Sequence, residues 1–310
     1  MRNLISILDL EAESLAALVS QGVELASRPP ETYDKSLSGK LVGLYFSQRS
    51  TRTQTAFHRA VQLLGGQTIA YSGTNLQVGS GETLSDTGAA LGLYLDLLVM
   101  RTNGDPRELI AISQKTDMPV INALCRQEHP TQAIADLITM REHFGLLEGI
   151  RILYLGAANN TMYSLALAAA MTPGIQLTLV TPDTFSLSSE QLETLATLAR
   201  SNGSHIKQLY SIDDICDRFE AVYTTRWASM GIAPSEGNWR EKFKGFRVDR
   251  AFLDRTLSAG GVFMHDLPAQ RQVEVTDDVM DGSESIIWKQ ARNKMTASVV
   301  ALRHCLGSDA

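Results

Sequence analysis

The sequence predicts an α/β protein made of two domains, each an open and mostly parallel β-sheet. Short apolar runs alternate with longer amphipathic stretches, a pattern typical of parallel strands joined by helical crossovers. The alternation breaks at residues 144–149 and then restarts. The chain has 310 residues. Because single hydrophobic cores stop growing at about 250–300 residues, two cores are expected.

In the first domain, the apolar run at residues 41–46 predicts a buried strand. Apolar residues with helical spacing follow it over residues 53–64 and predict a helix. A longer helix is expected over residues 130–143, because Pro130 suits the first turn of a helix. The remaining expectations are strands at 68–71, 95–100 and 119–123 and helices at 82–93 and 106–114.

The second domain repeats the pattern. Its expected strands are 151–155, 176–180, 221–223 and 261–264, and its expected helices are 161–170, 189–201 and 234–244. The final stretch, 285–306, reads as a helix long enough to pack back onto the first domain. The predicted domains are therefore residues 1–143 together with about 290–310, and residues 144–289.

Composition argues against two classes of protein. With 28 Lys+Arg against 34 Asp+Glu and a pI near 5.6, the chain has no basic stripe for nucleic acid. The most apolar stretch, residues 87–100, contains Asp96 and is shorter than the ~20 residues of a membrane span.

Acidic residues interrupt the first 13 residues, unlike a secretory signal. The three distant cysteines are expected to be buried, reduced thiols, so a cytoplasmic location is predicted.

The first chemical motif is Ser50-Thr51-Arg52-Thr53, which follows a strand and opens a helix. Unpaired N–H groups at a helix start attract anions, and Arg can hold a phosphate through two hydrogen bonds. The alternative is an ordinary Ser N-cap with a solvent-facing Arg.

The second motif, His129-Pro-Thr-Gln132, also lies at a helix start after a strand. The spacing places His129 and Gln132 on one helix face, where one can donate to a carbonyl oxygen and the other can recognise an amide. The alternative is a capping His and a surface Gln. Arg101 ends an apolar strand and is either functional or part of a structural salt bridge.

In the second domain, polar segments follow three of the strands, at residues 156–160, 224–231 and 265–268. The single Gly156 is not a GxGxxG fingerprint, and neither that pattern nor GxxxxGK[ST] occurs in the chain. A nicotinamide dehydrogenase or a P-loop NTPase therefore loses its main support. Arg226 as a solvated loop charge and Asp266 as a turn residue remain the alternatives to functional roles.

These motifs, in this order, make the chain resemble the aspartate/ornithine carbamoyltransferase family over essentially its whole length. Ser50-Thr-Arg-Thr53 resembles the carbamoyl-phosphate loop of that family, and His129-Pro-Thr-Gln132 matches its second signature. The ornithine branch is favoured by several other segments: Asn159-Asn160, Ser229-Met230-Gly231, His265-x-Leu-Pro268 and Glu274-Val-Thr-Asp-Asp-Val279.

The resemblance implies a carbamoyl-phosphate site without a metal or organic cofactor. Donors to the carbamoyl oxygen would be Thr53, Arg101 and His129. The carbamoyl NH2 would be held by Gln132 and the Leu267 carbonyl. The full implied set for carbamoyl phosphate is Ser50, Thr51, Arg52, Thr53, Arg101, His129, Gln132, Leu267 and Lys294. The implied catalytic set is Arg52, Thr53, Arg101, His129, Gln132 and Asp266.

The resemblance also implies an amino-acid acceptor and a homotrimer with shared sites, in which Gln77 reaches into the neighbouring subunit. Arg226 would hold a carboxylate of the acceptor and Asp266 its reacting amine. The full implied set for the acceptor is Asn160, Thr225, Arg226, Ser229, Met230 and Asp266.

The sequence departs from the ornithine branch at the acceptor site. Ornithine enzymes usually have Asp at the position of Thr225 and Cys at that of Asp266, while Thr225-Arg226 resembles a pair of the aspartate enzymes. Lys294 stands where the family has Arg, and loses the two-pronged guanidinium contact. We therefore predict a carbamoyltransferase whose acceptor is a shorter diamino acid or one with an extra carboxylate. The alternatives are an ornithine carbamoyltransferase making citrulline and a non-catalytic, anion-binding paralogue that regulates a partner.

Overall fold

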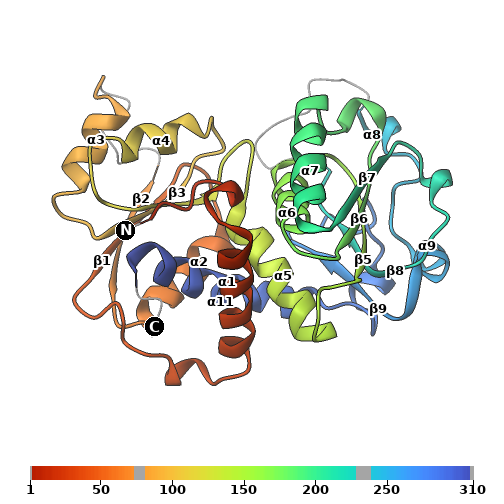
Figure 1. Cartoon of the computed structure of the whole chain (residues 1–310), viewed down its shortest axis with the longest axis horizontal. Coiled ribbons are helices and arrows are strands. Elements are labelled where there is room, and N and C mark those ends of the chain that lie inside the picture. The colour runs from red at the N-terminus through yellow and green to blue at the C-terminus, as the bar shows by residue number, and fades with distance from the viewer. Residues whose placement is uncertain (1, 73–80, 228–238, 308–310) are drawn as a thin grey trace. The chain divides into compact units, whose positions relative to one another are not determined.

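The computed structural model describes residues 2–72, 81–227 and 239–307. The chain divides into two compact units, the first made of Met1–Ile138 and Arg292–Ala310 and the second of Thr139–Ala291. Both boundaries fall inside helices, α5 (Pro130–Phe144) and α11 (Ile287–Leu306) (Figure 1). Most of α11 therefore belongs to the first unit, although it follows the second unit in the sequence.

The first unit contains a four-stranded parallel sheet in the order β2-β1-β3-β4. Every residue of the central strand β3 is buried, whereas most of the edge strand β2 is exposed. Helix α2 packs on β1 and β2, and α4 packs on β4 and α3. In chain order the elements are α1 (Ala12–Ala26), β1 (Leu41–Phe46), α2 (Thr51–Leu63), β2 (Gln67–Ser72), α3 (Leu84–Leu91), β3 (Leu97–Arg101), α4 (Arg107–Ser113) and β4 (Val120–Leu124).

The second unit contains a five-stranded parallel sheet in the order β7-β6-β5-β8-β9. Helices α6 and α7 pack against each other and against this sheet, and α9 packs on β8. The elements are β5 (Arg151–Leu155), α6 (Asn160–Ala170), β6 (Gln176–Val180), α7 (Ser189–Asn202), β7 (His205–Leu209), β8 (Phe219–Thr224), α8 (Trp239–Lys242), α9 (Arg250–Thr256), β9 (Leu257–His265) and α10 (Asp277–Met280). Short 3-10 turns occur at Ile7–Asp9, Pro30–Thr32, Asp183–Phe185 and Ile212–Asp214.

The predicted fold class, two parallel-sheet α/β units, is confirmed, but several elements differ from the prediction. Strand β7 was not predicted, because its residues are only half-buried at the sheet edge and form no apolar run. Helices α1, α9 and α10 were also missed. The expected helix at 234–244 is described only as α8, since residues 228–238 lie outside the described part. Cys125 and Cys305 are buried as expected, but Cys216 is exposed.

Both sheets have a switch point, where consecutive crossovers leave in opposite directions. It lies between β1 and β3 in the first unit and between β5 and β8 in the second. Open α/β sheets bind ligands outside the carboxyl ends of their strands at this point. No helix in the described part of the chain has the length and apolar run that a membrane span requires.

Candidate active site

The switch point of the first unit joins two predicted residues, Ser50 and Arg101. Ser50 follows β1 and is the N-cap of α2, while Arg101 is the last residue of β3. Both side chains are buried, and the Arg101 Nη1 donates a hydrogen bond to Ser50 Oγ at 3.2 Å. Ser50 makes no side-chain capping bond to α2. Ser50 therefore occupies the N-cap position, but its hydroxyl accepts from Arg101 and does not cap the first N–H groups of α2.

The next three residues form the first turn of α2. Thr51 is exposed, Arg52 is half-buried and Thr53 is buried. No acidic residue lies in this turn to oppose the positive end of the helix dipole. Hydroxyl groups, a guanidinium and helix N–H groups are thus concentrated at one end of β1, a combination suited to an anion such as a phosphate.

His129 lies immediately before α5 and is almost fully buried, as is Gln132 in the first turn of that helix. The alternative with a surface Gln is therefore wrong. Burial lowers the pKa of His129 well below its usual value, and the positive charges of Lys294 and Arg101 lower it further. The imidazole is consequently neutral near pH 7. A neutral imidazole can donate one N–H to a carbonyl oxygen without placing a second full charge there.

Gln132 is oriented by two buried neighbours. Its Nε2 donates to Asp136 Oδ1 at 2.7 Å, one turn later on α5, and its Oε1 accepts a hydrogen bond from Lys294 Nζ. Lys294 lies on the part of α11 that belongs to the first unit. The predicted residue Lys294 is therefore brought to Gln132. Asp136 was not predicted, although its position four residues after Gln132 is a signal that could have identified it.

In the second unit, the residues that follow β5, β8 and β9 meet at one carboxylate. Asp266 accepts hydrogen bonds from Thr225 Oγ1 at 2.8 Å and from Thr161 Oγ1 at 3.1 Å. Thr225 is buried, and the Asp266 side chain is 15% exposed, so a ligand can reach it. Asp266 is therefore more than a turn residue. Thr161 was missed, because a Thr in the first turn of a helix has no distinctive sequence signal.

Three further predicted residues are sequence neighbours of Thr161, Thr225 and Asp266. Asn160 begins α6, and its neighbour Asn159 caps that helix by accepting from Met162 N. Arg226 directly follows Thr225 and is partly buried. Leu267 follows Asp266 and has a φ of 57°. Gln77, Ser229 and Met230 lie outside the described residues.

Gly156 shows why a lone glycine occurs after β5. Its φ of 143° lies in a region that other residues avoid, and a Cβ there would lie 3.2 Å from the Trp227 ring. Trp227 in turn stacks on Phe243 with ring centroids 4.8 Å apart. The glycine therefore permits a tight turn and close packing at the switch point. It needs no dinucleotide to explain it.

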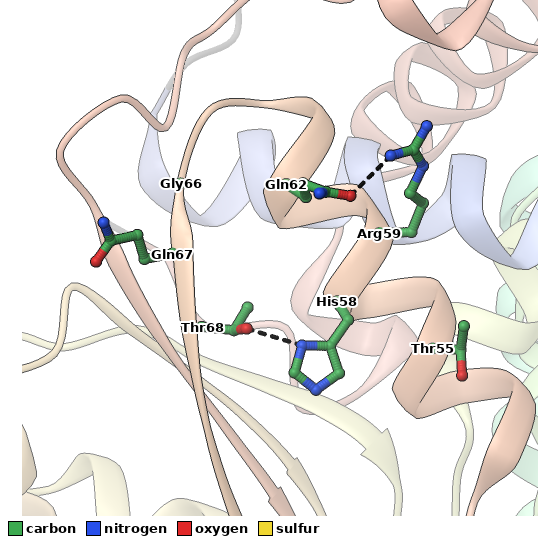
Figure 2. Close-up of a pocket in the computed structure, with 7 residues that line it drawn as sticks. All are labelled: Thr55, His58, Arg59, Gln62, Gly66, Gln67 and Thr68. Carbon is green, nitrogen blue, oxygen red and sulfur yellow. Dashed lines mark hydrogen bonds between the residues drawn. The ribbon is translucent and has the colours of Figure 1, made fainter.

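A polar pocket of about 630 Å³ lies elsewhere in the first unit, between α2 and the edge strand β2 (Figure 2). Figure 2 shows His58 pointing to Thr68, and their Nδ1 and Oγ1 atoms are 2.7 Å apart. None of its lining residues belongs to the predicted site: Thr55, His58, Arg59, Gln62, Gly66, Gln67 and Thr68. The buried charges and hydrogen bonds of the predicted site residues lie at the switch points instead.

The fold and these residues define a two-unit α/β protein with buried cationic and hydroxyl groups at the switch point of one unit and a partly exposed carboxylate in the other. Comparison with known proteins identifies the class. The family model for the aspartate/ornithine carbamoyltransferase carbamoyl-P binding domain matches residues 2–142, and that for the Asp/Orn binding domain matches residues 148–304. The chain belongs to the aspartate/ornithine carbamoyltransferase family. The prediction of a carbamoyltransferase is confirmed.

Several relatives cover nearly the whole chain. The catabolic ornithine carbamoyltransferase of Thermoplasma acidophilum is 34% identical over 95% of both proteins. The ornithine carbamoyltransferase of Gloeobacter violaceus is 35% identical over 98% of this chain and 96% of its own length. The structure of the Pyrococcus furiosus ornithine carbamoyltransferase matches with a TM-score of 0.90 and 29% identity, covering 99% of this chain and 97% of its own. None of these comparisons supports an acceptor other than ornithine.

Proposed function

We propose that this carbamoyltransferase moves the carbamoyl group of carbamoyl phosphate to the side-chain amine of ornithine, releasing phosphate. The names of the relatives support ornithine over the shorter or more acidic acceptor expected from Thr225 and Asp266. The observation that supports the reaction class is the cluster of positively charged and N–H donor groups at the switch point of the first unit. There, uncapped helix N–H groups, Arg101 and a neutral His129 converge.

In this proposal, carbamoyl phosphate binds to the first unit. Its phosphate lies on the first turn of α2 and is held by Ser50, Thr51, Arg52 and Thr53. As the amine attacks, negative charge grows on the carbamoyl oxygen, and N–H donors there stabilise it most when they are already in place. Arg101 and His129 are suited to this because both are buried. Lys294 contacts Gln132, so it orients the group that recognises the carbamoyl NH2.

The acceptor amino acid binds to the second unit, and Asp266 holds its reacting amine. An alkylamine is mostly protonated at pH 7, yet only the neutral form attacks. A carboxylate that binds the ammonium orients it and helps it to lose a proton. Thr161 and Thr225 each occupy one oxygen of Asp266. A carboxylate oxygen accepts about two hydrogen bonds, so each oxygen keeps capacity for the amine.

The position of this carboxylate favours a second candidate acceptor. With Thr at 225 and Asp at 266, the acid lies after β9 instead of after β8, the place expected for an ornithine enzyme. A moved anchor suits an acceptor of different length, such as 2,3-diaminopropionate. A homotrimer in which Gln77 completes a neighbouring site, and a cytoplasmic location, also remain proposals.

The test is phosphate release from carbamoyl phosphate with ornithine, aspartate, 2,3-diaminopropionate and putrescine. We expect ornithine to give the highest kcat/KM. A higher value for another amine would replace ornithine with that acceptor, and no release with any amine would favour a non-catalytic paralogue. Asp266→Asn should lower kcat/KM for the acceptor about 100-fold, since a charge-assisted bond contributes about 1.5–3 kcal/mol. Asp277→Asn, which alters an exposed pair with Arg271, is the control.

A further inference from the structure

The turn that carries Asp266 holds an unfavourable backbone conformation. Leu267 has a φ of 57°, in the left-handed region that favours glycine over a leucine. Its N–H donates to His265 Nδ1, two residues earlier, at 2.9 Å. A side chain of the preceding strand therefore binds the backbone of the turn at its strained residue. Strained backbone at a ligand site persists only where the surroundings determine it.

The same hydrogen bond fixes the tautomer of His265. Because Nδ1 accepts from Leu267, it carries no proton, and the ring proton lies on Nε2. Nε2 is 3.4 Å from Glu274 Oε1, which also accepts from Gln270 N. His265 and Glu274 are each only 1% exposed, so neither reaches a substrate. The backbone N–H of His265 is held in turn by Gln290 Oε1 at 2.9 Å.

His265 also does not neutralise the charge of Asp266. His265 Nδ1 lies 3.6 Å from Asp266 Oδ1, but without a proton it cannot form an ion pair with that carboxylate. Asp266 is therefore left to the two threonine hydroxyls and to a ligand. Among the described residues, Glu274 Oε2 has no hydrogen-bond partner although it is buried. Such a group costs stability, so packing alone does not explain a carboxylate there.

We propose that Glu274 and His265 are positioning residues: Glu274 holds the imidazole, and the imidazole holds the Leu267 N–H, so that Asp266 is presented at a fixed place. This inference rests on the proposed function, in which Asp266 anchors the acceptor amine. Loosening the turn should raise KM for the acceptor and lower kcat. It should leave the affinity for carbamoyl phosphate within about threefold, because that ligand is assigned chiefly to the first unit.

Two substitutions at position 265 separate positioning from packing. In His265→Asn the side-chain oxygen lies near the place of Nδ1 and can still accept from Leu267 N–H. In His265→Gln the polar end lies near the place of Nε2 and leaves Leu267 unbound. Both variants lose the ring, so a packing role would affect them alike. We expect the Asn variant to keep kcat/KM for the acceptor within fivefold of wild type, and the Gln variant to lose at least 20-fold.

Hydrogen exchange at the Leu267 amide, measured by NMR, reports on the hydrogen bond from Leu267 N–H to His265 Nδ1 and requires no turnover. Protection should persist in His265→Asn and fall at least tenfold in His265→Gln. Equal protection in the two variants, or changed protection with unchanged acceptor kinetics, overturns the proposal. If the wild-type protein transfers the carbamoyl group to no amine, the proposed function fails. The exchange result still decides whether His265 holds the Leu267 N–H.

Substitutions at Glu274 give a second pair, needed if His265→Gln does not fold. Glu274→Gln keeps an oxygen that accepts from His265 Nε2, and should retain acceptor kcat/KM within fivefold. Glu274→Leu removes it and should lose at least tenfold, with Leu267 protection lowered. Glu220→Gln is the control, because Glu220 pairs with Arg151 at the amino ends of β8 and β5, whereas the site lies at the carboxyl ends of these strands. Equal acceptor kinetics for the Gln and Leu variants would overturn the role of Glu274.

Discussion

The first turn of α2 contains no acidic residue, and Arg52 adds a positive charge there. The residue lies in the first turn of α2, where the helix dipole and Arg101 add to its potential. We expect Arg52→Ala to reduce carbamoyl transfer at least 100-fold. The reason is that losing a charge-assisted partner in a closed site costs about 3–5 kcal/mol. Arg49→Ala, three residues earlier and exposed, is the control. A rate within tenfold of wild type would remove Arg52 from the phosphate site.

The proposed role of His129 predicts a larger effect on turnover than on substrate binding. As a donor to the carbamoyl oxygen, its loss in His129→Ala should lower kcat by about 10²–10³-fold, the usual effect of removing one such donor. Carbamoyl-phosphate binding should change much less. Losses of equal size in binding and turnover would instead indicate that His129 only positions the substrate.

The depressed pKa of His129 also predicts a pH dependence of stability. An unfolded His titrates near 6.5, but in the folded chain burial, Lys294 and Arg101 keep His129 neutral to lower pH. Below pH 6.5 the unfolded state therefore binds more protons, and the free energy of unfolding falls as the pH falls. One proton corresponds to about 1.4 kcal/mol per pH unit. Urea unfolding between pH 7 and 5 should show a flatter dependence for His129→Asn. The same slope in both proteins would contradict the shift.

At the level of elements, burial predicts that the central strands contribute more to stability than the edge strands. Leu98 in β3 is fully buried, whereas Ile69 in the edge strand β2 is 41% exposed. Leu98→Ala should lower the free energy of unfolding by about 2–5 kcal/mol, because it leaves a cavity in a packed core. Ile69→Ala is the matched control and should cost well below 1.5 kcal/mol. Similar losses measured by urea unfolding would show that β3 is not central to the core.

The sequence predicted the buried central strands and also the exposed edge strand β2, but it missed the edge strand β7 and helix α1. Strands β1, β3 and β5 form apolar runs because helices or loops cover both of their faces. Strand β7 is half-exposed, so its alternation is too weak to detect. Helix α1 did carry a signal, since Leu15, Leu18 and Val19 share one buried face, and it was overlooked.

The candidate site likewise contains residues that the sequence could single out and residues that it could not. Residues in short motifs, such as Ser50 and His129, could be singled out from the sequence because their types and spacing are distinctive. Asp136, the partner of Gln132, and Thr161, the partner of Asp266, were not singled out, because they act through contacts that only the folded chain makes. The Ser50–Arg101 bond joins residues 51 positions apart, one after β1 and the other at the end of β3, and these strands become neighbours only in the sheet. Sequence spacing contains no information on such a contact.

At the level of the whole molecule, the proposed trimer makes the activity depend on assembly. Gln77 lies in the polar segment Asn75-Leu-Gln-Val-Gly-Ser, and the family resemblance places this segment in the neighbouring subunit's site. If so, one site takes Arg52 from one subunit and Gln77 from another. A trimer that contains both kinds of inactive subunit can then form some sites with neither change. Subunits that act alone cannot.

The prediction is that Arg52→Ala and Gln77→Ala proteins, each nearly inactive, regain activity when they are mixed under conditions that allow subunits to exchange. With three subunits per trimer and random mixing, a substantial minority of the sites should be intact, so activity should rise well above the sum of the separate proteins. A mixture of Arg52→Ala with His129→Ala is the control. Each site would take both Arg52 and His129 from a single subunit, so every site in this mixture contains one of the two changes. Sedimentation of the wild type establishes the assembly independently. A fully active monomer, or mixtures that never exceed the sum of their components, would place Gln77 outside the site.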